Sequence, residues 1–373
     1  MRVAAPFGRA LPLLAALLAF APIAAGAQVA DKPAAPGPAA TGKSMIYFDN
    51  DFLGPGQSNI QALIPLLRDD HVDLVGIGVV TGDAWLKEEV AHTLRFLEIA
   101  GRGDVPVLAG AEMPLMRTQA EMHAWEARYG VIPWKGAWNA AKPGRSYHPD
   151  DPSIVPDLVE GAPRLKPSPE DAIAFLIREV RAHPHQITIV TAGPLTNIAL
   201  AVRIAPDLPQ LVKEIVIEGG GIDRALARVT GNTDYGTDFN LLFDPEAAHI
   251  VLTAAWPRVT MLGNVTGSVK VTPELATRIG AASTPVARYF DSYARRGQPM
   301  WDEIVTAVAV DRTLVTDEVV VRMDVDLLPG PTYGQAQIWN EQFAPKMGER
   351  EVHLVRSIDT DRFLARFVAQ ASR

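Results

Sequence analysis

The chain contains no cysteine among its 373 residues. Disulfide bonds and thiolate catalysis are therefore excluded, and stability must come from burial of a hydrophobic core, which a chain of this length can supply. A block rich in lysine or arginine is also missing, and 35 basic against 43 acidic residues leave a formal net charge of −8. This balance argues against a nucleic acid as an electrostatic partner.

An apolar run long enough to cross a membrane is missing as well. Basic residues precede the run from Leu11 to Ala25, and Ala25-Gly26-Ala27 offers a small-residue cleavage site. A membrane anchor needs about 20 apolar residues, whereas Pro12 and Pro22 bracket a shorter stretch. We therefore expect residues 1–27 to be a signal peptide and the mature protein to be periplasmic or secreted, with no membrane partner after cleavage.

The rest of the chain is organised as one domain. Residues 28–43 are rich in Ala, Pro and Gly without periodicity, which predicts a flexible linker. From residue 44 to 373, apolar runs alternate with helical patterns, which predicts parallel strands joined by crossover helices. The expected strands are 45–48, 72–80, 187–190, 215–217 and 259–262, and the expected helices are 60–67, 85–100, 195–205, 245–255 and 302–314.

One stretch, residues 111–165, interrupts this alternation. It is long, rich in Pro and Gly, and carries Trp125, Tyr129, Trp134, Trp138 and Tyr147. Loops of this length in a compact domain are usually functional covers or insertions. Two interpretations stay open: an aromatic cover over a binding site, or an insertion that packs its aromatic residues onto the scaffold.

Acidic residues stand where the expected first strand ends. Asp49 and Asp51 follow an apolar run, a Gly/Pro turn comes next, and Ser58 and Asn59 begin the following helix. Ligands of open parallel sheets collect beyond the carboxyl ends of the strands. The two carboxylates are therefore candidates for binding a metal ion or sugar hydroxyls.

Two later segments carry further polar groups. The strand 187–190 stops at Gly193-Pro194, leaving the Ala192 carbonyl able to bind a cation, although many such turns serve the backbone alone. Asn232, Asp238 and Asn240 follow three glycines and suit a polyhydroxyl ligand.

Two acidic residues near expected helix starts have simpler explanations. Asp244 precedes Pro245, which is typical of a helix cap with Pro at the first helical position. Asp302 either caps its helix or contributes to a site.

In order, these four segments resemble the inosine-uridine-preferring nucleoside hydrolase family, over about residues 44–325. Asp49-Asn50-Asp51 and Pro55-Gly56-Gln57-Ser58-Asn59 match the family's D-x-D-P-G-x-D-D motif around an inserted Phe52-Leu53-Gly54. Gly-Pro-Leu-Thr-Asn at 193–197 matches the turn that follows a calcium-binding carbonyl. The spacing between Asn232 and Asn240 matches that of two substrate-binding Asn residues in the family, and Asp302 falls on a late calcium-ligand Asp. Val80-Thr81-Gly82-Asp83 matches the end of the family's second strand.

The resemblance implies a single α/β domain with a Rossmann-like nucleoside hydrolase fold, in which helices flank a mostly parallel central sheet. It implies hydrolysis of the N-glycosidic bond of ribonucleosides to ribose and free base, with a Ca²⁺-bound water as nucleophile. The expected general base is Asp51. The expected calcium ligands are Asp51, Asn59, Ala192 and Asp302, and the expected substrate-binding residues are Asp49, Asp83, Asn232, Asp238, Asn240 and Trp301.

The sequence departs from the family pattern at two places. Ser58 and Asn59 replace an acidic pair, and Trp301 stands where some members carry a His thought to protonate the leaving base. Indole is no acid at ordinary pH, so Trp301 is instead expected to stack on the base. Asp83 would restore one carboxylate if it lies in the same crevice.

The sequence alone leaves other functions open. A catalytically reduced nucleoside- or ribose-binding protein on the same fold is the main alternative. A haloacid-dehalogenase-like phosphotransferase would also have an Asp-x-Asp strand end, but it favours Thr or Val where Leu53 stands. Family members are commonly dimers or tetramers, so a homo-oligomer is expected.

Overall fold

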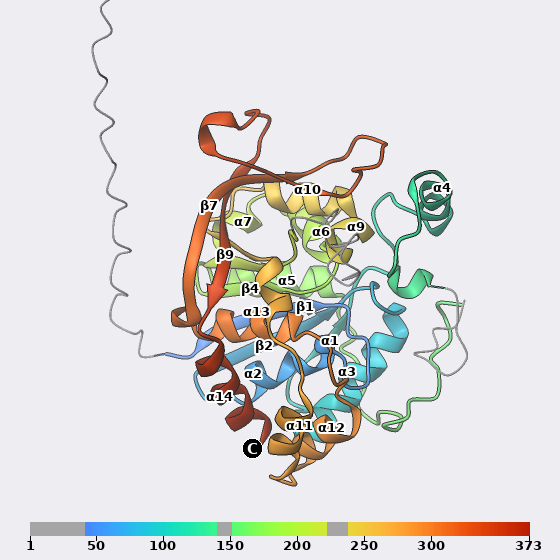
Figure 1. Ribbon diagram of the computed structural model, residues 1–373, viewed down its shortest axis with the longest axis vertical. Helices are drawn as coiled ribbons and strands as arrows, with labels where there is room; N and C mark the ends of the chain where they lie inside the picture. The colour runs from blue at the N-terminus through green and yellow to red at the C-terminus, as the bar shows by residue number, and fades with distance from the viewer. Residues whose placement is uncertain (1–41, 140–150, 222–237) are drawn as a thin grey trace, which may run out of the picture. The chain divides into compact units, whose positions relative to one another are not determined.

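The computed structural model describes residues 42–139, 151–221 and 238–373, and Gly42–Arg373 form one unit (Figure 1). The expected signal peptide, most of the expected linker, Tyr147 and Asn232 lie outside the described residues. Within the described part of the chain, no helix combines the length and apolarity needed to cross a bilayer.

The described strands form one nine-stranded sheet, in the order β3-β2-β1-β4-β5-β6-β9-β7-β8. Pairing is parallel from β3 to β9, whereas β7 pairs antiparallel with both β9 and β8. The prediction of a mostly parallel α/β sheet is therefore confirmed. The strands are β1 (Ser44–Asn50), β2 (Val72–Val79), β3 (Val107–Ala109), β4 (Ile187–Thr191), β5 (Glu214–Glu218), β6 (Val259–Leu262), β7 (Val315–Val325), β8 (Ala336–Trp339) and β9 (Arg350–Ile358).

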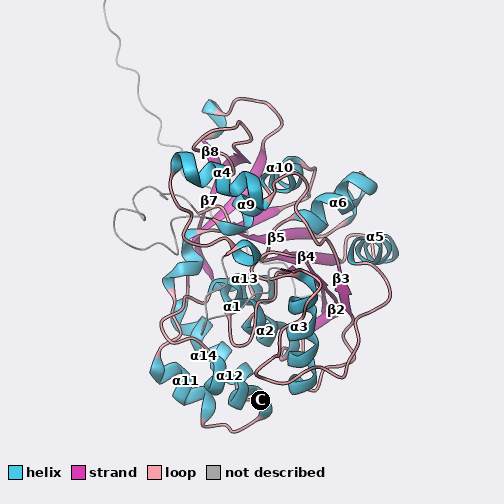
Figure 2. Ribbon diagram, turned by 90° about the vertical axis from the view of Figure 1, so that its right-hand side faces the viewer, coloured by secondary structure: helices cyan, strands magenta, loops and turns pink. Residues whose placement is uncertain are grey.

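The central strands are buried on both faces. In β1, Ile46 and Phe48 join one hydrophobic cluster, and Tyr47 joins the other. Alternate side chains of a strand point to opposite faces, so an apolar run of this kind needs helices on both sides. Figure 2 shows the strands between two groups of helices.

The helices on the first face are α1 (Ser58–Gln61), α2 (Leu63–Leu67), α3 (Leu86–Ala100), α11 (Pro273–Gly280), α12 (Pro285–Tyr293), α13 (Trp301–Val310) and α14 (Thr360–Ala371). Those on the second are α5 (Ala172–Ala182), α6 (Thr196–Ile204), α7 (Leu208–Leu211) and α10 (Pro245–Thr253). Two more, α4 (Gln119–Tyr129) and α9 (Phe239–Phe243), lie beside a third, smaller cluster.

The single helix expected over 60–67 is divided into α1 and α2 at Ala62. Pro65 explains the break, because it lacks the N–H that a continuous helix would donate to the carbonyl of Gln61. Ser58 and Asn59 are the first two residues of α1, which follows the loop after β1.

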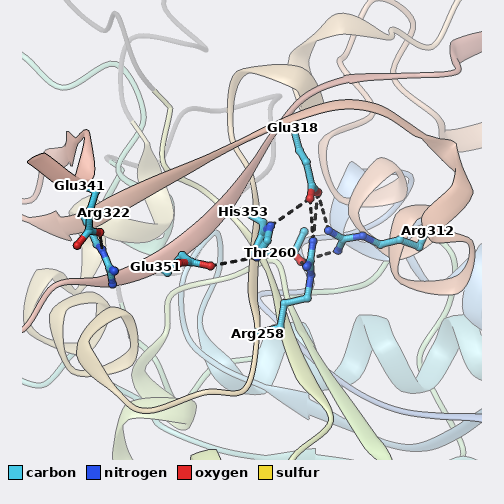
Figure 3. A network of polar contacts seen from close by, with 8 residues as sticks. All are labelled: Arg258, Thr260, Arg312, Glu318, Arg322, Glu341, Glu351 and His353. Carbon is cyan, nitrogen blue, oxygen red and sulfur yellow. Dashed lines mark hydrogen bonds and ion pairs between the residues drawn. The ribbon is translucent and has the colours of Figure 1, made fainter. Parts of the chain in front are cut away.

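The antiparallel C-terminal strands β7, β8 and β9 were not expected from the sequence. Glu318 of β7 accepts hydrogen bonds from Arg258 at 3.0 Å, from Arg312 at 2.7 Å and from His353 of β9 at 3.0 Å (Figure 3). Arg258 directly precedes β6, so this network joins the antiparallel strands to the parallel part of the sheet. The groups are partly exposed, and each pair contributes modestly to stability.

Gly78 of β2 gives a test of how tightly the sheet is packed beside Asp49. The two residues are partners in the β1–β2 register, and a Cβ at Gly78 would lie 2.1 Å from Tyr47 Oη and 2.2 Å from Asp49 Oδ2. Gly78→Ala should therefore lower the free energy of unfolding by about 1–3 kcal/mol, measured by urea denaturation. Gly330→Ala is the control, because its Cβ would meet only the Leu328 carbonyl at 3.8 Å. Equal stability of both variants would contradict the packing described here.

Candidate active site

Asp51 follows β1 and is 1% exposed. Its Oδ2 accepts the backbone N–H of Asp83 at 2.8 Å, and its Oδ1 accepts from Asn59 Nδ2 at 3.2 Å. Burial, and then repulsion from Asp83 and Asp302, raise the pKa of Asp51 well above its usual range. Asp51 and Asp302, assigned to one site in the sequence, are linked by hydrogen bonds: Asn59 donates to Asp51, and Asn50 donates both to the Asn59 carbonyl and to Asp302.

Asp302 lies in the first turn of α13. The N-cap position of this helix belongs to Met300, so the interpretation of Asp302 as a mere cap is wrong. Its Oδ2 accepts from Asn50 Nδ2 at 3.0 Å. Burial raises the pKa of Asp302 to about 8, against the opposite effect of the Asn50 hydrogen bond.

Asp49 is held by two donors at the end of β1. Asn197 Nδ2 donates to its Oδ2 at 3.0 Å, and Tyr47 Oη donates at 3.3 Å. Burial raises the pKa of Asp49 to about 7, although both hydrogen bonds favour the carboxylate. Asn197 was missed as a site residue, and its signal was its position in the Gly-Pro-Leu-Thr-Asn turn that already pointed to Ala192.

Asn240, in α9, joins two strand ends. Its Nδ2 donates to the Ala192 carbonyl at 2.7 Å and to Glu218 Oε2 at 2.8 Å. Glu218 was also missed, although it is an acid at the end of β5, the same signal that selected Asp49 and Asp51. Burial, and then repulsion from Asp238 and Asp302, raise its pKa.

The other expected residues have simpler surroundings. Asp238 caps α9, with Oδ1 accepting from Leu241 N at 3.2 Å and Oδ2 from Gly221 N at 2.8 Å. Trp301 is the partly buried first residue of α13. Asp244 caps α10 by accepting from Ala247 N, which confirms its structural interpretation.

The aromatic insertion packs onto the scaffold beside Asp83. Trp138 is 2% exposed and stacks near Phe243, with ring centroids 4.4 Å apart. Trp134 Nε1 donates to Asp83 Oδ1, and Ala137 N donates to the Gly82 carbonyl at 2.8 Å. The insertion therefore supports the loop whose backbone holds Asp51.

The oxygen atoms of Asp51, Asp302 and Asn50 are candidate ligands for a metal ion. Among the described residues, no group of three or more His, Cys, Asp or Glu is arranged to hold one. The carboxylates of Asp51 and Asp302 are both buried and are linked by hydrogen bonds through Asn59 and Asn50. The nearby Asn50 Oδ1 is buried and has no hydrogen-bond partner. An oxygen-rich site of this kind fits a hard cation such as Ca²⁺.

Comparison with known proteins identifies the family. Residues 46–365 match the family model described as inosine-uridine preferring nucleoside hydrolase. The chain belongs to this family. The nucleoside hydrolase is 31% identical to the uncharacterized protein C800.11 of Schizosaccharomyces pombe, over 84% of this chain and 80% of the relative. It is 28% identical to the pyrimidine-specific ribonucleoside hydrolase RihB of Escherichia coli O1:K1, over 86% and 95%.

Solved structures show the same fold. An inosine-guanosine nucleoside hydrolase aligns with a TM-score of 0.68 at 22% identity, covering 88% of this chain and 98% of that one. A plant nucleoside hydrolase, PpNRh1, aligns at 0.67 and 21% identity, over 88% and 99%. Membership of this family shows that the protein is an enzyme that hydrolyses ribonucleosides. Its substrates are small-molecule nucleosides.

The contact between Trp134 and Asp83 makes a testable prediction. Trp134→Phe removes the indole donor and should lower kcat/KM for inosine or uridine about tenfold, because a displaced Asp83 no longer positions Asp51. Trp125→Phe is the matched control, since its indole in the same insertion donates to the Gly330 carbonyl instead. Steady-state kinetics should separate the two variants, and equal kcat/KM values would contradict a specific role for Trp134.

Proposed function

We propose that this nucleoside hydrolase cleaves its substrate by attack of water on the anomeric carbon, with Asp51 as general base. The water oxygen bonds to the carbon, the C–N bond breaks, and the base leaves with the bonding electron pair. Asp51 takes the proton of the water. Its fixed position supports this role, because the Asp83 N–H and the Asn59 amide hold its two carboxylate oxygens at the end of β1.

The neighbouring acids support the same chemistry. Positive charge builds on the ribosyl ring in an oxocarbenium-like transition state. Asp49 and Asp302 are buried and Glu218 is half-buried at the same edge of the sheet, where carboxylates stabilise such charge more strongly than in water. The observation that carries the proposal is that Asp51 and Asp302, both buried and distant in sequence, are linked by hydrogen bonds through Asn59 and Asn50.

We also propose Ca²⁺ as the cofactor. When bound, it would hold the ribose hydroxyls and lower the pKa of the attacking water. Asp51 and Asp302 would bind it through carboxylate oxygens, Ala192 through its carbonyl and Asn59 through its amide oxygen. A neutral amide replaces an acid at 59, so two carboxylates balance the charge of the ion.

The remaining expected residues would bind the nucleoside. Asp49, Asp83, Asp238 and Asn240 surround the strand ends and would contact the ribose hydroxyls, and Trp301 would stack on the base. Asn232, which lies outside the described residues, stays part of this prediction. The binding-protein alternative is less favoured, because the family comprises hydrolases.

Export is a separate proposal. Residues 1–27 have the basic, apolar and small-residue pattern of a signal peptide, which would place the mature enzyme in the periplasm or outside the cell. Self-association also stays a prediction.

The general base can be tested by removing its carboxylate. Asp51→Ala should lower kcat by about 10²–10⁴-fold, because the water loses its proton acceptor. Asp73→Ala, at an exposed position of β2, is the control and should keep wild-type kcat. Both variants should be checked by circular dichroism. Retained turnover in Asp51→Ala would refute the assignment.

The cofactor can be tested by removing and restoring the metal. Treatment with EDTA should abolish release of the base from inosine and uridine, and added CaCl₂ should restore it. Calorimetric titration of the treated protein with CaCl₂, with and without ribose, gives binding independently of turnover. Full activity after EDTA treatment would contradict a calcium cofactor, and calcium and ribose binding without turnover would favour the binding protein.

A further inference from the structure

A buried pair, Ser58 and Glu303, adjoins the site but has no part in the mechanism above. Ser58 Oγ donates to Glu303 Oε2 at 2.5 Å and accepts the backbone N–H of Asp302 at 2.9 Å. The two side chains are 245 positions apart in the sequence, and their residues are 2% and 1% exposed. One hydroxyl thus joins the start of α1 to the first turn of α13.

The geometry of this hydroxyl leaves it little freedom. A serine O–H has a single proton, and here it points to Glu303, so an oxygen lone pair is left to accept from Asp302. The Asp302 N–H is one of the backbone donors that the first turn of a helix leaves without a helical partner. Glu303 therefore sets the orientation of Ser58, and Ser58 in turn satisfies the backbone of Asp302.

Hydrogen bonds of neighbouring residues link α1, the end of β1 and α13. Asn59, next to Ser58, donates to Asp51 Oδ1, and its carbonyl accepts from Asn50 Nδ2 at 3.3 Å. Asn50 also donates to Asp302 Oδ2. Any separation of α1 from α13 would therefore move Asn59 and Asp302 relative to Asp51.

We propose that Glu303 is a positioning residue of this enzyme: acting through Ser58, it holds α1 against α13 so that Asn59 and Asp302 keep their places beside Asp51. This inference rests on the proposed calcium-dependent hydrolysis. Among the described residues, Glu303 makes no hydrogen bond to the carboxylate of Asp51 or of Asp302. It therefore acts on them through the Ser58 hydroxyl.

The first experiment compares two replacements of Glu303. Glu303→Met keeps the shape but removes the acceptor, and should weaken CaCl₂ binding and lower kcat/KM about tenfold each, as loss of groups that orient metal ligands typically does. Glu303→Gln keeps an oxygen acceptor for Ser58 and should retain both values within about threefold. This rescue by the conservative variant separates positioning through Ser58 from the need for a charge.

The second experiment moves the carboxyl group across the contact. Ser58→Asp alone places two buried carboxyl groups against each other and should lose calcium binding and turnover. Combined with Glu303→Gln it should recover both, because the new amide donates to the new carboxylate, which still accepts the Asp302 N–H. A double variant as impaired as Ser58→Asp would overturn the proposal.

A matched control is a buried glutamate that contacts His92 instead of Ser58. Glu160 is also buried, with one carboxylate oxygen contacting His92 and the other, Oε2, without a partner. Glu160→Met should lower the melting temperature but leave the calcium dissociation constant and kcat/KM unchanged. If Glu303→Met behaves in the same way while the wild type binds CaCl₂ and hydrolyses nucleosides, the positioning role is wrong. If the wild type does neither, the proposed function fails and the positioning role fails with it.

Discussion

Burial of several carboxyl groups at one edge of a parallel sheet is the constraint on which the site depends. Asp49 and Asp51 lie at the end of β1 and Glu218 at the end of β5, and each accepts a hydrogen bond from a neutral amide of another segment. These bonds offset part of the desolvation, yet burial still raises the three pKa values. A bound cation would relieve the remaining repulsion between the carboxylates. The same carboxylate oxygens would then affect both the stability of the fold and the function of the site.

The fold brings these groups together because parallel strands end on the same side. The loops after β1, β4 and β5 open toward one edge, and α13 adds Asp302 from the last third of the chain. Side-chain amides from the starts of α1, α6 and α9 then donate hydrogen bonds to groups at the strand ends. The site is thus made by helix starts as much as by strand ends.

Sequence patterns predicted much of the fold, and the reasons are local. Apolar runs of three to nine residues mark β1, β2, β4, β5 and β6, and caps such as Asp244-Pro245 mark helix starts. The antiparallel strands β7 and β9 were not predicted, because both are partly exposed and such strands have a weaker apolar pattern. The break at Pro65 was readable from its missing N–H, but the apolar residues around it favoured one continuous helix.

By itself, the sequence determined the absence of cysteine chemistry, the alternation of strands and helices, and the acids at the ends of β1. Only the tertiary structure decided which groups these acids meet. The contacts Asn197–Asp49, Trp134–Asp83 and Ser58–Glu303 join residues 148, 51 and 245 positions apart. Such pairings depend on how helices dock against the sheet, and no local periodicity encodes that distance or direction, because a side chain's neighbours across an interface are set by packing of the whole core.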